Sequence, residues 1–123
     1  MSRPTLVAVA HGSKDPAARE TIVALAREVV RFAPVIDVRV AFIQHAEPSL
    51  GDELSAAGEN AVIVPLLLST GYHLATDIAD AASAAGARVA GPLGPDTLLV
   101  TALAGRLAEA GVPDGTPDRK SVV

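Results

Sequence analysis

Residues Thr5–Pro16 read TLVAVAHGSKDP, and this stretch indicates the fold more clearly than any other part of the chain. Its first half, Thr5–Ala10, is a continuous apolar run of the kind that forms a strand buried on both faces of a sheet. A polar turn containing Gly12 follows, and Ala17–Ala33 then places apolar residues at helical spacing with charged residues mostly opposite. A strand that passes through such a turn into an amphipathic helix predicts a parallel α/β protein.

The same alternation of strand and helix continues along the chain. Further strands are predicted at Val35–Phe42, Ala61–Leu68 and Ala87–Ala90. Further helices are predicted at Ser49–Ala57, Thr76–Ala85 and Thr97–Ala110, with Ser49, Thr76 and Asp96 or Thr97 as N-caps. We therefore expect an α/β fold with a four-stranded parallel sheet, in the order 2-1-3-4, and helices on both faces.

Two local features affect the predicted end of the third strand and the predicted end of the domain. Pro65 interrupts the third apolar run, and because proline donates no ladder hydrogen bond it predicts a bulge or an irregular end to that strand. After Gly111 the chain is rich in Pro, Gly and Asp and loses its periodicity. We expect residues 1–111 to form one domain and residues 112–123 to be a flexible tail or a truncated linker.

The composition excludes several classes of partner. Aromatic residues make up only 2% of the 123 residues, so there is no platform for stacking bases. The formal net charge is −4 and the basic residues are scattered, which argues against binding to nucleic acid. The chain has no cysteine and no apolar run of membrane-spanning length. We expect a cytoplasmic protein whose metal ligands, if any, are not thiolates.

The first candidate site is the turn His11-Gly12-Ser13-Lys14-Asp15-Pro16. Ligands of open α/β sheets bind at the carboxyl ends of strands, which is where this turn lies. The N–H groups that begin the following helix can hold an anion. Alternatively, the segment is an ordinary strand-to-helix turn in which His11 only caps a backbone group.

A second candidate segment, Pro65–His73, has the same layout after the third apolar run. In the predicted order, strands one and three are neighbours, so His11 and His73 leave adjacent carboxyl ends and can converge on one metal ion. The third histidine, His45, follows the second strand in the segment that also holds Gln44 and Glu47. Any of these three side chains could complete the site, and a polar loop before an N-cap would look similar.

Three segments, VAVAHGSKDP, AFIQHAEPSL and VPLLLSTGYHLATDI, resemble the motif regions of the class II chelatases, specifically the sirohydrochlorin chelatases of siroheme and cobalamin synthesis. The resemblance spans roughly residues 4–110 and implies a small flavodoxin-like chelatase fold. His11 and His73 match the family's metal-site histidines. Family members often have a glutamate where this chain has Gln44, and an amide is a weaker, neutral ligand. Glu47 is not transferred as a replacement.

The resemblance implies a lyase-type enzyme that inserts Co²⁺ or Fe²⁺ into sirohydrochlorin, without a cofactor beyond this substrate ion. We assign His11 and His73 to catalysis and metal binding, with Gln44 as a further metal residue. Substrate contacts are expected from Gly12, Ser13, Lys14, Ser69, Thr70, Gly71 and Tyr72. A non-catalytic cobalt or nickel delivery protein, and a module that binds phosphate or carboxylate, are the alternatives. A tetrapyrrole is large for one small sheet edge, so we expect a homodimer or part of a two-domain chain.

Overall fold

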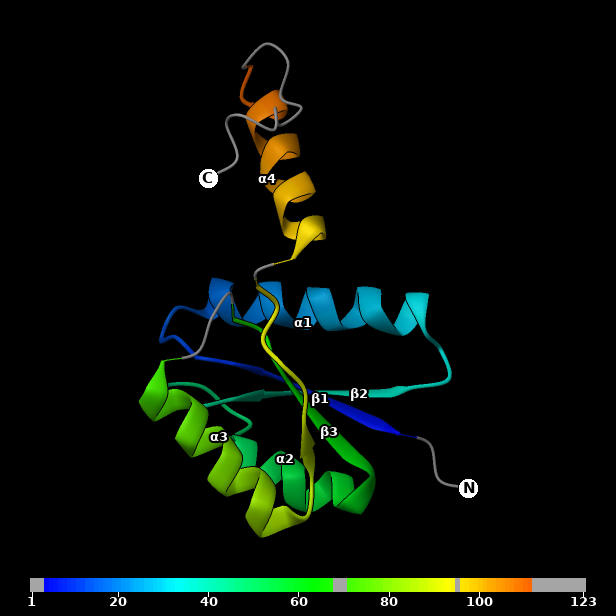
Figure 1. Cartoon of the computed structure of the whole chain (residues 1–123), viewed down its shortest axis with the longest axis vertical. Helices are drawn as coiled ribbons and strands as arrows, with labels where there is room; N and C mark the ends of the chain where they lie inside the picture. Colours follow the sequence, from blue (N-terminus) through cyan, green and yellow to red (C-terminus); the bar gives the residue numbers. More distant parts are fainter. Residues whose placement is uncertain (1–3, 68–70, 95, 112–123) are drawn as a thin grey trace. The chain divides into compact units, whose positions relative to one another are not determined.

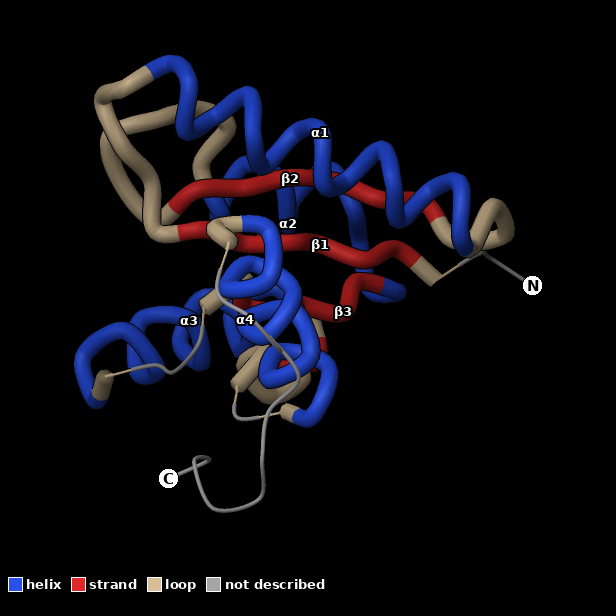
Figure 2. Tube along the Cα trace, turned by 90° about the horizontal axis from the view of Figure 1, so that it is seen from above, coloured by secondary structure: helices blue, strands red, loops and turns tan. Residues whose placement is uncertain are grey.

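The computed structural model describes residues 4–67, 71–94 and 96–111. The chain divides into two compact units, Met1–Pro92 and Leu93–Val123, which are described separately. The first unit contains the sheet and the second contains one helix among its described residues. Figure 1 shows the whole chain and Figure 2 shows it along a second direction. No helix among the described residues is long and apolar enough to cross a membrane.

The sheet of the first unit has the predicted topology. Its strands are β1 (Thr5–Ala10), β2 (Asp37–Phe42), β3 (Ala61–Pro65) and β4 (Arg88–Val89). They pair in parallel in the order β2-β1-β3-β4, which confirms the predicted fold class. The sequence predicts irregularity at the proline of the third run, and β3 ends at that residue.

The helices of the first unit are α1 (Pro16–Phe32), α2 (Leu50–Ala57), the short 3-10 turn η1 (Gly58–Asn60) and α3 (Tyr72–Ala85). The Ser49 hydroxyl caps α2 by accepting from the N–H of Asp52, as predicted. Thr76 was expected to cap α3, and this is wrong: α3 begins one turn earlier, with Gly71 in extended conformation at the N-cap. The earlier start places His73 inside the first turn of α3.

The core lies between one face of the sheet and helices α2 and α3. Figure 1 shows these two helices on the face opposite α1. Alternate residues of the strands point toward α2 and α3, and the buried cluster consists of Val7, Val9, Ala41, Leu50, Leu54, Ala61, Ile63, Ile78 and Ala82. By contrast, α1 contributes no buried residue. The buried cluster of this unit therefore lies on the α2 and α3 side of the sheet.

The second unit contains α4 (Thr97–Glu109). Asp96 is its N-cap and accepts from the N–H of Leu98 at 2.8 Å, which confirms one of the two predicted caps. Three large apolar side chains of α4 are exposed, and they are Leu98, Leu103 and Leu107.

Candidate functional site

The candidate site begins where β1 and β2 end side by side. Beyond the two strands, the N–H of Ile43 donates to the carbonyl of Ala10 at 3.0 Å, and the N–H of Gln44 donates to the carbonyl of His11 at 3.1 Å. The pairing of the two strands therefore continues past their ends. His11 and Gln44, both exposed, lie next to each other at the carboxyl edge of the sheet.

The side chains of these two residues are in direct contact. The amide nitrogen Nε2 of Gln44 lies 2.7 Å from Nε2 of His11. An amide nitrogen can only donate, so in this arrangement the N–H of Gln44 points toward the imidazole Nε2 as acceptor. Its lone pair is occupied by Gln44, and a metal ion can bind at Nε2 only if the amide rotates away. Such a rotation would turn the amide oxygen, a possible metal ligand, toward the same space.

Gly12 is required by the close approach of the two chain segments. Its φ angle is 104°, which L side chains rarely adopt, and an added Cβ would lie 1.7 Å from the carbonyl oxygen of Gln44. No side chain fits at that distance. The glycine after His11 therefore allows the backbone of Gln44 to pack against the turn, which is what brings the two site residues together.

The loop after Gln44 is fixed at several points. His45 adopts a positive φ of 65°, and the N–H of Phe42 donates to the carbonyl of Pro48 at 2.9 Å. From α1, Nε of Arg19 donates to the carbonyl oxygen of Glu47 at 3.1 Å. The sequence did not identify Arg19. The available signal was its position four residues after the helix N-cap Asp15, on the same face of α1.

A groove of about 510 Å³ lies beside this loop. It is lined by Ser13, Lys14, Asp15, Pro16, Arg19, His45, Ala46 and Glu47. His45 and Glu47 thus belong to the groove, whereas Gln44 is the residue that contacts His11. Over the described residues, no group of three or more His, Cys, Asp or Glu side chains could hold a metal ion. Among the candidate ligands, Gln44 is the described side chain in hydrogen-bond contact with His11.

The third motif approaches the same edge of the sheet. The N–H of Leu66 donates to the carbonyl of Val9 at 2.8 Å, so the chain leaves β3 next to the end of β1. Figure 1 shows that α1 and α3 begin at the same edge of the sheet. Ser69 and Thr70 lie outside the described residues, and only the backbone of Tyr72 and His73 is described. The role of His73 as a second ligand stays a prediction.

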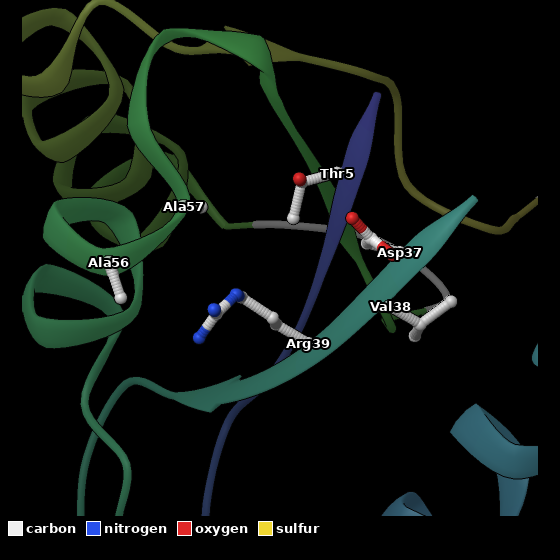
Figure 3. A pocket seen from close by; sticks show the side chains of 6 residues that line it. All are labelled: Thr5, Asp37, Val38, Arg39, Ala56 and Ala57. Carbon is white, nitrogen blue, oxygen red and sulfur yellow. The ribbon is translucent and has the colours of Figure 1, made fainter. Parts of the chain in front are cut away.

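A further hollow of about 600 Å³ occurs at the amino ends of the strands (Figure 3). Thr5 and Asp37, the first residues of β1 and β2, line it together with Arg39. The guanidinium of Arg39 is already paired with the carboxylate of Glu53 at 2.9 Å. Because α/β sheets bind their ligands at the carboxyl ends, we place the functional site at the opposite edge, around His11.

Comparisons with known proteins agree with the sequence motifs. A family model described as CbiX matches residues 5–110. The sirohydrochlorin cobaltochelatase of Methanosarcina barkeri is 31% identical over 77 residues. This match covers 59% of the present chain and 59% of the length of that relative.

Two solved structures have a similar fold. One, from Marinobacter aquaeolei VT8, is described as a cobalamin (vitamin B12) biosynthesis CbiX protein; its TM-score is 0.73 at 29% identity, covering 86% of this chain and 95% of that one. The other is the sirohydrochlorin chelatase SirB from Bacillus subtilis subspecies spizizenii in complex with cobalt. Its TM-score is 0.75 at 24% identity, and the match covers 88% of this chain but 51% of SirB. At that identity the likeness to SirB concerns the fold.

The contact between Gly12 and Gln44 can be tested by adding one methyl group. Gly12→Ala should lower the free energy of unfolding by about 3 kcal/mol or more, because the Cβ would meet a backbone oxygen and the φ angle is unfavourable for alanine. Gly51→Ala is the matched control, because a Cβ there meets nothing within 4 Å, and it should change stability by about 1 kcal/mol or less. Urea unfolding measures both. Equal, small effects would show that the contact is not needed.

The neutral residue at position 44 can be tested by restoring a carboxylate. Gln44→Glu should tighten Co²⁺ binding by about tenfold, because a charged oxygen beside His11 is a stronger ligand and a better partner for imidazole than an amide. Calorimetric titration with Co²⁺ measures the affinity. Glu47→Gln, in the neighbouring groove, should leave that affinity unchanged. An unchanged or weaker affinity in Gln44→Glu would remove Gln44 from the metal site.

Proposed function

The chain belongs to the CbiX family, and from this premise we propose that it is a sirohydrochlorin chelatase, which inserts Co²⁺ or Fe²⁺ into the tetrapyrrole in cobalamin or siroheme synthesis. The observation that carries the proposal is the exposed pair His11 and Gln44, in contact at the carboxyl edge of the sheet. The name of the Methanosarcina relative and the cobalt bound to SirB support the same reaction class.

Metal insertion replaces two ring protons with one divalent cation, and imidazole can assist both changes. The divalent ion sheds water and enters the ring, and two pyrrole N–H groups lose their protons. Neutral imidazole can bind Co²⁺ or Fe²⁺ and can accept a proton near neutral pH. In the proposed mechanism, His11 and His73 present the metal ion to one face of the ring, one of them takes one pyrrole proton, and the other proton passes to water.

Gln44 acts on His11 in this mechanism. Its amide nitrogen lies 2.7 Å from Nε2 of His11 and occupies that side of the imidazole in the resting site. When the metal ion arrives, the amide rotates and its oxygen faces the ion. A neutral amide does this without attracting the cation as strongly as a carboxylate would, so the site should release the metal ion readily to the ring.

Sirohydrochlorin is rich in carboxylates, whereas the chain has a formal net charge of −4. The overall field therefore repels the substrate, and local donors must hold it. The start of α1, with Ser13 and Lys14, offers N–H, O–H and ammonium groups at the correct edge. We assign the same role to Gly12 and Gly71, to Tyr72, and to Ser69 and Thr70, which lie outside the described residues.

The sheet of one chain offers only its carboxyl edge as a binding surface for a large planar tetrapyrrole. The match to SirB covers 51% of that chain, so a SirB chain is long enough to supply a second half where this chain supplies one. A second copy of the present chain would fill the same need. We therefore propose that the active form is a homodimer in which both copies contact the ring, and a two-domain parent chain is the alternative.

The catalytic assignment predicts a loss of turnover without a loss of folding. His11→Ala and His73→Ala should each lower the rate of Co²⁺ insertion into sirohydrochlorin at least about 100-fold, because each removes an imidazole for metal binding and proton transfer. Absorption spectroscopy follows the insertion. Because His11 is exposed, His11→Ala should keep its free energy of unfolding within about 0.5 kcal/mol. Asn60→Ala, at the opposite edge of the sheet, is the control and should retain full activity.

The results of the insertion and binding assays distinguish the proposed enzyme from the alternative functions. Repeated turnover by the unmodified chain supports the enzyme. Binding of Co²⁺ with no insertion would instead indicate a metal delivery protein and overturn the proposed reaction. Binding of neither Co²⁺ nor sirohydrochlorin would leave a module for other anions. Loss of cooperative unfolding in His11→Ala would show that the histidine is structural.

The homodimer is tested by sedimentation velocity at micromolar concentration, with insertion activity measured on the same sample. We expect a dimer that is active. A monomer that still turns over sirohydrochlorin would contradict the dimer, and an inactive monomer would indicate that a second domain is missing.

A further inference from the structure

Arg19 lies in the second turn of α1 and uses only part of its hydrogen-bonding capacity within the protein. Its Nε donates to the carbonyl oxygen of Glu47 at 3.1 Å. A guanidinium has five N–H donors, of which four belong to the two terminal nitrogens. Across the described residues, the ion pairs join Arg31 to Glu28, Arg39 to Glu53 and Arg106 to Glu109, and none involves Arg19. The terminal nitrogens of Arg19 are therefore available to an external acceptor.

Arg19 lines two neighbouring hollows. The groove of about 510 Å³ has somewhat more apolar than polar surface, and its lining includes the cations Lys14 and Arg19. A second hollow of about 320 Å³ is mainly apolar, and its lining is Ala10, Gly12, Ser13, Ala18, Arg19, Thr21, Ile22 and Phe42. Ser13 and Arg19 line both. A ligand that fills the two together needs an apolar body and an anionic substituent.

Among the described side chains, the carboxylates in the groove form no ion pair with its cations. Asp15 is occupied as the N-cap of α1, where its Oδ1 accepts from the N–H of Ala17 at 3.0 Å. Within the described part of the chain, neither Asp15 nor Glu47 forms an ion pair with Lys14 or Arg19. An added carboxylate near Arg19 and Lys14 would thus meet two unpaired cations close to the positive end of a 17-residue helix.

We propose that Arg19 is a substrate-binding residue whose terminal nitrogens hold a carboxylate of the tetrapyrrole, while its Nε holds the loop that follows Gln44. This inference rests on the proposed chelatase function and adds a contact that the sequence motifs do not include. An arginine suits the position because its planar fork can bind the loop carbonyl with one N–H and a carboxylate with two others. A lysine ammonium lacks this planar fork and could not give the carboxylate the same bidentate contact.

The test compares Arg19→Ala, Arg19→Lys and the control Arg27→Ala, an exposed arginine further along the same helix. Binding of metal-free sirohydrochlorin, followed by its absorption, should weaken by about tenfold to 100-fold in Arg19→Ala, as expected for the loss of a charged hydrogen bond. Arg19→Lys should recover only part of this affinity. Arg27→Ala should bind as the unmodified chain does.

Two further measurements distinguish a substrate contact from an effect through the loop. Arg19→Ala should raise KM for sirohydrochlorin with little change in kcat, and its affinity for Co²⁺ alone should be unchanged. Sirohydrochlorin whose carboxylates are converted to neutral amides should bind Arg19→Ala and the unmodified chain equally. A lower kcat with an unchanged KM, or a weaker Co²⁺ affinity, would show that Arg19 acts on Gln44 through the loop and would overturn the proposed contact.

The binding assay needs no turnover, so it separates this inference from the proposed function. If the unmodified chain binds sirohydrochlorin but inserts no metal, the chelatase proposal fails while the effect of Arg19→Ala on binding still tests the contact. If insertion proceeds and Arg19→Ala binds sirohydrochlorin as tightly as the unmodified chain, the contact is excluded while the function stands.

Discussion

The close approach of Gly12 to the backbone of Gln44 is the constraint on which the arrangement of the site depends. A Cβ at position 12 would lie 1.7 Å from the Gln44 carbonyl oxygen, so the turn after β1 and the loop after β2 meet only because this residue has no side chain. The same approach lets the N–H of Gln44 reach the carbonyl of His11. A backbone requirement thereby fixes which polar side chain stands beside the exposed histidine.

Stability and chemistry are separated within the first unit. The buried cluster lies between the sheet and α2 and α3, and its largest fully buried side chains include Ile63 and Ile78. His11, Gln44 and Lys14 are exposed at the carboxyl edge and carry little of the packing. Substitutions at the edge can therefore alter metal or substrate binding without unfolding the sheet, which makes the site open to direct experimental test.

Most of the fold could be predicted because its signals are local. Continuous apolar runs gave the strands, and Ser49 and Asp96 marked helix starts with side chains that do cap. The start of α3 was placed a turn too late because its N-cap is Gly71, which has no capping side chain and leaves no trace in the sequence. Thr76, which has a suitable side chain, was chosen in its place.

The site could be predicted only in part. The motifs drew attention to His11 and Gln44, but their contact depends on the register of two strands. Arg19 escaped notice because its partner is a main-chain oxygen 28 residues away, and a backbone acceptor carries no sequence signal. The approach of Gly12 to Gln44 also joins residues far apart in the sequence through a backbone atom, so local pattern does not reveal it. Local pattern therefore indicates where the site lies, and long-range backbone contacts decide which side chains meet there.

The central claim is that the metal ion binds at His11 and that Gln44 moves to admit it. A crystal of the chain grown with Co²⁺ and measured at the cobalt absorption edge tests this most directly. We predict an anomalous peak about 2.0–2.2 Å from a ring nitrogen of His11, with the Gln44 amide rotated out of its present contact. A cobalt ion bound elsewhere, with the contact between His11 and Gln44 unchanged, would contradict the account.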